Sequence, residues 1–94
     1  MKIRFAQEED IPQILVFIRG LAEYEHMLDQ VVATEPLLRE WLFEKQIAEV
    51  LIGEAEGVPV GCALFFHNFS TFLGRGGIYL EDLYILPQYR GKGY

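Results

Sequence analysis

The stretch 78–94, IYLEDLYILPQYRGKGY, decides the fold of this chain. Its first part, 78–86, is apolar and aromatic apart from the acidic pair Glu81 and Asp82, and this composition favours a β-strand. Pro87 ends the strand, because proline has no N–H to donate to a sheet ladder. A basic, glycine-rich turn follows at 88–93. A strand that leads into such a turn is typical of a phosphate cradle, in which backbone N–H groups approach the anion and basic side chains add charge.

The composition indicates one small globular domain. The 94 residues are 51% hydrophobic and 14% aromatic, which excludes a disordered chain and allows a modest core. The net charge of −6 argues against a nucleic-acid partner, which would need a basic patch. The same charge suits a cationic substrate, although solubility alone explains it equally well.

The chain carries one cysteine, Cys62, so an internal disulfide is excluded and a reducing, cytoplasmic compartment is expected. No run of residues has the pattern of a signal peptide, and none is apolar for long enough to cross a membrane. Cys62, His26 and His67 do not have the spacing of metal ligands, so we expect no metal site. Cys62 follows a glycine within a strand pattern, which favours a small core residue over a nucleophile.

Helix and strand patterns alternate along the chain in a definite order. Strand patterns occupy residues 2–6, 46–55, 60–69 and 78–86. An acidic first turn opens a helix that we expect to end near 24–26, and Thr34 caps a second helix. Helical spacing predicts two buried stripes, Ile11, Ile14, Leu15, Ile18, Leu21 and Ala22 in the first helix and Leu37, Leu38, Trp41 and Leu42 in the second. The order β-α-α-β-β-β, with an antiparallel meander after the helices, predicts an α/β (α+β) fold.

Three motifs resemble the GNAT acyltransferases. The run Arg90-Gly91-Lys92-Gly93 matches the acetyl-CoA-binding signature Arg/Gln-x-x-Gly-x-Gly/Ala, whose last small residue falls beyond Tyr94. The runs Tyr79-Leu80-Glu81-Asp82, Tyr89-Arg90-Gly91-Lys92-Gly93 and Leu21-Ala22-Glu23-Tyr24-Glu25 are similar to the diamine (spermidine/spermine) N-acetyltransferase branch. The resemblance runs along the whole chain and covers only the N-terminal part of such an enzyme. It implies that residues 1–94 are the N-terminal portion of a single GNAT domain, ending inside the pyrophosphate-binding motif.

The resemblance implies direct transfer of an acetyl group from acetyl-CoA to a primary amine of a small cationic substrate. The amine is protonated at neutral pH, since its pKa is like that of lysine, about 10.4. Glu81 is the candidate for receiving its proton through water, and Tyr24 and Glu25 match positions that contact the amine together with Glu81. The alternatives are a solvated strand carboxylate for Glu81 and a solvated helix end for Tyr24 and Glu25. We expect Asp82 to point to the opposite face of the strand from Glu81, so that the two cannot act as a close pair, and we expect Asp82 to be structural.

For the co-substrate, the resemblance implies a bulge that exposes the backbone of Leu83, Tyr84 and Ile85 to the pantetheine arm and the thioester. We expect the side chains of these three residues to lie in the core. Arg90, Gly91, Lys92 and Gly93 would bind the pyrophosphate, the alternative being an ordinary basic surface turn.

Two departures from the family limit these expectations. The second half of the family's domain is missing, and with it the general-acid tyrosine and part of the CoA groove, so the 94 residues alone should be inactive. Thr71 stands where the diamine branch has an acidic substrate contact. The alternative function is a non-catalytic CoA-binding or interaction module. The alternatives for the 94 residues are self-association, as a homodimer that covers the uncovered sheet face or an apolar edge made of Leu80, Leu83, Tyr84, Ile85 and Leu86, and order only beside further chain.

Overall fold

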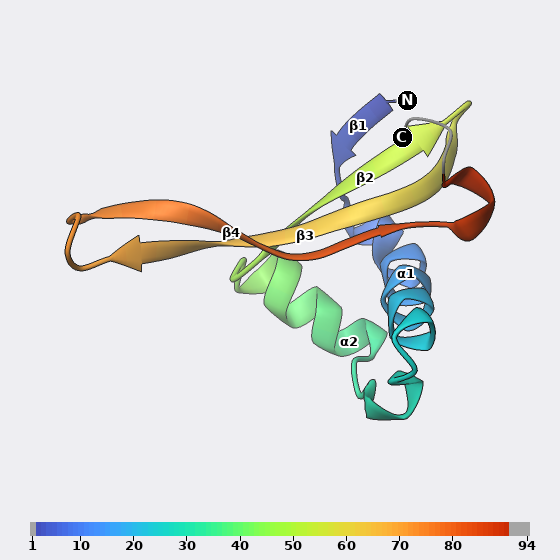
Figure 1. The fold of residues 1–94 in the computed structure, drawn as a ribbon, viewed down its shortest axis with the longest axis horizontal. Coiled ribbons are helices and arrows are strands. Elements are labelled where there is room, and N and C mark those ends of the chain that lie inside the picture. The colour runs from blue at the N-terminus through green and yellow to red at the C-terminus, as the bar shows by residue number, and fades with distance from the viewer. Residues whose placement is uncertain (1, 91–94) are drawn as a thin grey trace.

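The computed structural model describes residues 2–90 of the chain. Four strands in this part form one sheet (Figure 1). They are β1 (Lys2–Phe5), β2 (Glu49–Ala55), β3 (Val58–Ser70) and β4 (Arg75–Ile85). Each strand is antiparallel to the next, in the order β1-β2-β3-β4. The outer edge of β4 therefore has no partner strand within residues 2–90. The predicted order of elements and the antiparallel meander are confirmed.

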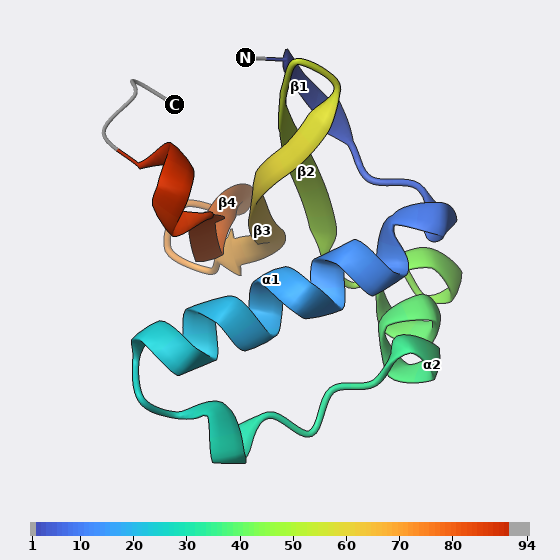
Figure 2. The ribbon, with the colours of Figure 1, turned by 90° about the vertical axis from the view of Figure 1, so that its right-hand side faces the viewer.

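The helices lie on one face of this sheet (Figure 2). They are η1 (Glu8–Asp10), α1 (Ile11–Tyr24), η2 (Leu28–Gln30), α2 (Glu35–Leu38) and the π-helical turn η3 (Arg39–Glu44). The short helix η4 (Pro87–Tyr89) follows the end of β4. No helix among residues 2–90 is long and apolar enough to cross a membrane. The opposite face of the sheet, which we call the open face, carries no helix in the described part of the chain.

The core lies between α1 and the middle strands. Ile11, Ile14 and Phe17 of α1 are almost completely buried, as are Ile52 of β2 and Val60 of β3. The stripe predicted for the first helix is confirmed at its N-terminal half, whereas Phe17, which was not predicted, is one of the most buried side chains of the core.

The prediction for the second helix is only partly right. Thr34 caps it as expected, with the Leu37 N–H donating to Thr34 Oγ1 at 3.3 Å. Leu38 is buried, but Trp41 is 45% exposed and lies beneath the Lys45 ammonium group, 4.0 Å from the ring centre. The backbone passes from an α-helix to a π-helix at Arg39, and the wider turn changes which residues share a face.

The β3–β4 hairpin is longer than the sequence predicts. β4 begins at Arg75 instead of residue 78, and the connecting turn shrinks to residues 71–74, with Gly74 at a φ of +68° that favours glycine. Phe65 is the last residue of β3 that pairs with β2. Beyond it the hairpin has only two strands and extends away from the body (Figure 1). We call this two-stranded part, residues 66–79, the arm.

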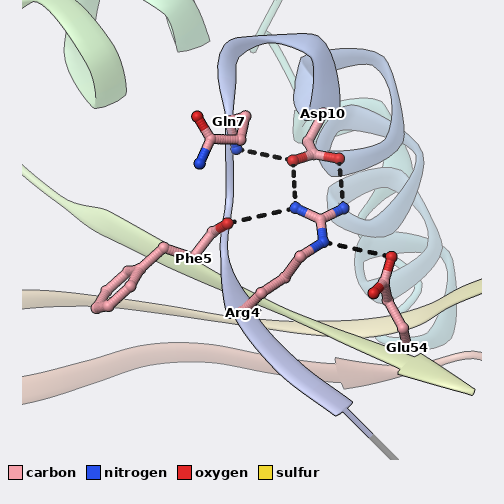
Figure 3. Close-up of polar contacts among 5 residues, drawn as sticks. All are labelled: Arg4, Phe5, Gln7, Asp10 and Glu54. Carbon is pink, nitrogen blue, oxygen red and sulfur yellow. Dashed lines mark hydrogen bonds and ion pairs between the residues drawn. The ribbon is translucent and has the colours of Figure 1, made fainter. Parts of the chain in front are cut away.

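An ion-pair network joins β1 to the start of the helical layer (Figure 3). Arg4 of β1 donates to both carboxylate oxygens of Asp10, at 2.7 and 2.9 Å, and lies 3.3 Å from Glu54 of β2. Asp10 also accepts a hydrogen bond from the Gln7 N–H at 2.7 Å. Asp10 is the buried charged residue of the described chain, and its partners lower the pKa of its carboxyl below the usual range. The network therefore fixes the entry into α1, whose far end carries two candidate site residues.

Candidate functional site

β4 has a bulge at Glu81, the residue that the sequence analysis proposes as the base. Leu64 of β3 pairs with Asp82, whereas Phe65 pairs with Leu80, so Glu81 is an extra residue in β4. A bulge sets two residues of one strand opposite a single residue of the other. Glu81 and Asp82 therefore both stand opposite Leu64. The expectation that they point to opposite faces assumed an uninterrupted alternation, which the bulge breaks at this position.

Asp82 lies in an acidic hollow between α1 and β4. The hollow has a volume of about 180 Å³, and its wall contains Glu25, Asp82, Ile18, Leu21, Ala22, Met27, Gln30 and Val31. The pKa of Asp82 is raised because burial disfavours its charged form and because the charges of Glu81 and Glu25 repel it. Three carboxylates thus gather where the end of α1 approaches the bulge. Such a cluster attracts an ammonium group, whose charge would relieve their mutual repulsion.

Arg90 lies against two tyrosines at the outer edge of β4. The centre of its guanidinium group is 4.8 Å from the ring centre of Tyr24 and 5.3 Å from that of Tyr84. Its Nε–H donates to the Ile85 carbonyl oxygen at 2.8 Å. A guanidinium over an aromatic ring is stabilised by about 0.5–1 kcal/mol at exposed sites. The side chain expected to contact phosphate is therefore held on the strand edge in this structure.

The side chains of residues 83–85 do not share one environment. Tyr84 is 6% exposed and packs against Phe17, with ring centres 5.9 Å apart. Ile85 is half-buried, and Leu83 is 62% exposed on the open face. The expectation of three core side chains holds for Tyr84 but fails for Leu83, which faces the side of the sheet that lacks helices.

Gly20 of α1 makes room for Tyr84. A Cβ atom added at Gly20 would lie 2.6 Å from the Tyr84 hydroxyl oxygen and 2.8 Å from the carbon that carries it. A glycine in the middle of a helix costs about 1 kcal/mol relative to alanine. That cost is offset here by the close approach of the phenol ring, which in turn supports Arg90.

The amine side and the co-substrate side of the site are neighbours. Tyr24, the exposed last residue of α1, lines a second hollow together with Leu83, Ile85 and Arg90. Leu21 lines both this hollow and the acidic one. The structure thus places the predicted residues at one end of α1, on β4 and directly after η4. They are Tyr24, Glu25, Glu81, Leu83, Tyr84, Ile85 and Arg90. Gly91, Lys92 and Gly93 lie outside the described residues.

Cys62 is buried, as expected for a small core residue. Burial, helped by the nearby charge of Asp82, raises the pKa of its thiol to about 12. A thiol with this pKa is protonated at neutral pH and does not act as a nucleophile. Residues 2–90 contain no group of three or more His, Cys, Asp or Glu side chains arranged to hold a metal ion.

Sequence reasoning missed two side chains of this site. Asp82 was taken as structural, although two adjacent acids within a strand pattern are a signal of an interrupted alternation. The Tyr84 side chain was assigned to the core alone, whereas one of its ring neighbours is Arg90. That contact joins residues which the sequence analysis did not connect, and no local pattern indicates it.

Comparisons with known proteins give a consistent result. Residues 15–94 match the acetyltransferase (GNAT) family. The chain is 45% identical over 100 aligned residues to thialysine N-epsilon-acetyltransferase of Bos taurus, covering 97% of this chain and 58% of that protein. It is 33% identical to spermidine/spermine N(1)-acetyltransferase-like protein 1 of Homo sapiens, covering 98% of this chain and 14% of that protein.

Solved structures share the fold. The crystal structure of ribosomal-protein-alanine N-acetyltransferase from Brucella melitensis biovar Abortus 2308 superposes with a TM-score of 0.75 at 20% identity, covering 98% of this chain and 61% of that one. This chain therefore spans about three-fifths of the length of the Bos taurus and Brucella proteins that it matches.

Proposed function

Because the chain belongs to the GNAT acetyltransferase family, we propose that it forms the amine pocket and the first part of the acetyl-CoA groove of an N-acetyltransferase. The substrate is a primary amine of a small cationic molecule, a polyamine or a lysine-like amine. The relatives named for thialysine and spermidine/spermine acetylation support this substrate class. By themselves the 94 residues carry out no measurable transfer.

One observation carries this proposal: the bulge that sets Glu81 beside Asp82, within electrostatic reach of Glu25, at the edge of an acidic hollow. In this arrangement Glu25 and Asp82 bind and orient the ammonium form of the substrate. Glu81, which is exposed to solvent, accepts the proton that the amine releases through a water molecule.

The reaction is a direct displacement at the thioester. The neutral amine nitrogen attacks the acetyl carbonyl carbon, the new N–C bond forms, and the C–S bond breaks. Before the attack, the ammonium group gives one proton through water to Glu81 and becomes the neutral amine. As the amide forms, the nitrogen releases its second proton to solvent, and the CoA thiolate takes a proton from a general acid. The resemblance places that acid, a tyrosine, in the part of the family's domain that lies beyond Tyr94.

The free edge of β4 fits the pantetheine arm. Residues 83–85 pair with β3 on one side, and on the outer side their backbone has no partner strand within residues 2–90. The Ile85 carbonyl oxygen there accepts a hydrogen bond from Arg90. Binding of acetyl-CoA requires Arg90 to leave that carbonyl and turn to the pyrophosphate, with Gly91, Lys92 and Gly93 supplying N–H groups and charge.

The experiment is a thiol-release assay on a chimera that joins residues 1–94 to the remaining C-terminal part of the Bos taurus relative. Acetyl-CoA is offered with thialysine, spermidine, ornithine and, as a neutral control, glycinamide near pH 9. We expect turnover with at least one of the cationic amines, and none from residues 1–94 alone. A chimera that binds CoA by calorimetry and acetylates no amine would refute the enzyme and favour a CoA-binding module.

A further inference from the structure

A hollow of about 430 Å³ lies between the end of β1, the π-helical turn η3 and the start of β2, and we call it the β1 hollow. It shares no lining residue with the two hollows of the candidate site. Its volume falls in the range of small-molecule pockets, roughly 300–1,000 Å³, whereas the acidic hollow is smaller. The reaction proposed above uses none of its residues, so the β1 hollow needs an explanation of its own.

The wall of the β1 hollow is mainly apolar and partly aromatic. Phe5, Leu42, Phe43 and Val50 line it, together with two alanines. Val50 belongs to the buried core, Leu42 and Phe43 are half-buried, and Phe5 is 58% exposed. An apolar group in the hollow would remove the exposed part of the Phe5 ring from water, which is favourable. The two phenylalanines favour a ring, because aromatic pairs gain more than their buried area when they stack offset or edge to face.

Backbone hydrogen bonds hold this wall in place. The Ala6 N–H donates to the Val50 carbonyl oxygen at 2.9 Å, and the Ile47 N–H donates to the Trp41 carbonyl oxygen at 2.9 Å. Gln46, which also lines the hollow, has a φ of +52°, a left-handed conformation that is uncommon for residues other than glycine. It comes two positions after η3, and both π-helical turns and such backbone strain are frequent at functional sites. The hollow is therefore preformed, which lowers the ordering cost of binding a ligand.

Glu49 gives the wall its one charged side chain. The other lining residues are apolar, apart from the amide of Gln46. Oε2 of Glu49 lies 2.9 Å from Nε2 of His67 at the base of the arm, so the carboxylate is held by one of its oxygens. Among residues 2–90 no lysine or arginine forms an ion pair with Glu49. The second oxygen is thus left to accept a hydrogen bond from a cation.

We propose that the β1 hollow binds a small arylalkyl ammonium ion at a site separate from that of the acetylated amine. The ring packs against Phe5 and Phe43, and the ammonium group donates to Oε1 of Glu49. A neutral ring compound lacks the ion pair, and a polyamine would place further charges against an apolar wall. Phenethylamine needs roughly 270 Å³, if each non-hydrogen atom takes about the 30 Å³ of a water molecule in the liquid, so it fits the hollow.

The test is a titration of the nitrogen-15-labelled 94-residue chain with phenethylamine, followed through the backbone amide shifts. We expect saturable shifts at residues 46–50 and around Phe5, with a dissociation constant of about 1 mM or below. The neutral analogue 2-phenylethanol should bind at least tenfold more weakly, because it cannot form the ion pair. The same titration on the chimera serves if the 94 residues alone give no dispersed spectrum.

Two outcomes of the titration would overturn the proposal. The first is the absence of saturable shifts. The second is a set of shifts confined to Glu25, Asp82 and their neighbours, because the amine would then bind only in the acidic hollow.

Variants test the two parts of the recognition. Glu49→Gln should weaken phenethylamine binding at least tenfold and leave that of 2-phenylethanol within about twofold. The matched control Glu44→Gln removes the same charge from an exposed position on η3 that does not line the hollow, so it should bind phenethylamine as the wild type does. Ala48→Trp fills the hollow without removing its charge and should abolish the binding of both compounds.

Equal affinities of Glu49→Gln and Glu44→Gln for phenethylamine would overturn the ion pair. Binding that survives Ala48→Trp would place the ligand outside the hollow and would also overturn the proposal. Glu49 lies outside the amine and co-substrate sites, so thiol release by the chimera should be unchanged in Glu49→Gln. A failure of this proposal is therefore distinguishable from a failure of the proposed acetyltransferase function.

Discussion

The guanidinium group of Arg90 rests on the ring of Tyr24, 4.8 Å from its centre, although 66 positions separate the two residues. Arg90 is assigned to the co-substrate and Tyr24 to the amine. Their contact means that a change on one side of the site alters the other, which neither motif indicates when it is considered by itself.

Tyr24→Leu should therefore weaken CoA binding although Tyr24 is an amine-side residue. The guanidinium group would lose one of its two aromatic faces, so we expect a loss of about two- to fivefold. Arg90→Ala should cost more, because both the phosphate contact and the stack disappear. Calorimetry with CoA on the chimera measures both. Arg19→Ala removes the same charge from an exposed position on α1 and should leave the affinity unchanged, and equal affinities for Arg90→Ala and Arg19→Ala would remove Arg90 from the site.

Glu81→Gln in the chimera should lower turnover by about 10²–10⁴-fold while acetyl-CoA binding stays nearly constant, because the amide cannot accept the proton of the amine. The deficit should shrink as the pH rises from 7 to 9, since more of the amine is then already neutral. Initial rates of thiol release across this range give the answer. A variant with wild-type turnover at every pH would show that Glu81 is not the base.

Asp10→Asn should destabilise the chain by about 1–3 kcal/mol, because Arg4 and the Gln7 N–H lose a charged acceptor. The folded-state pKa of Asp10 lies below its usual 3.8. Its contribution to stability is therefore present above pH 3.8 and is lost as the pH falls through the folded-state pKa. Urea unfolding at pH 7 and at pH 3 measures the difference between wild type and variant. If the difference in unfolding free energy between wild type and variant were as large at pH 3 as at pH 7, this assignment would be contradicted.

Asp82→Asn should change the stability at pH 7 in the opposite direction to Asp10→Asn. The pKa of Asp82 is raised above 3.8 by burial and by the charges of Glu81 and Glu25, so its stabilising contribution is present below pH 3.8 and is lost as the pH rises. The variant should therefore be more stable than the wild type at pH 7 and gain little at pH 3. A loss of stability at pH 7 would show that ionised Asp82 has a favourable partner.

Gly20→Ala should destabilise the chain by about 1–3 kcal/mol, although the same change in an open helix stabilises by about 1 kcal/mol. The new methyl group would displace the Tyr84 ring, which is closely packed against Phe17. The double variant Gly20→Ala/Tyr84→Leu has room for the new methyl group, so the losses of unfolding free energy in the two single variants should not add. Additive unfolding free energies would mean that Tyr84 does not fill the space above Gly20.

The sequence predicted the elements well where a local pattern determines them. The stripe of α1 and the meander of β2 and β3 follow from periodicity. The π-helical turn at Arg39 and the bulge at Glu81 do not follow from periodicity, because each interrupts a regular repeat. A bulge in this strand was implied only by the family resemblance. The candidate site residues were chosen from the family resemblance, and the structure places their motifs at the end of α1 and on β4, which are in contact. The contact of Arg90 with Tyr24 and Tyr84 could not be read from any window of sequence.

The bulge at Glu81 divides β4 into two segments. Odd-numbered residues face one side of the sheet before the bulge, and even-numbered residues face that side after it. Before it the odd-numbered residue Tyr79 pairs with Phe66, and after it the even-numbered residue Asp82 pairs with Leu64, on the same face of β3. Deletion of Glu81 would restore a single alternation and would leave the other pairs of β3 and β4 on their present faces. Glu81 is therefore the residue of β4 that the pairing with β3 does not use, and that residue is also the proposed base.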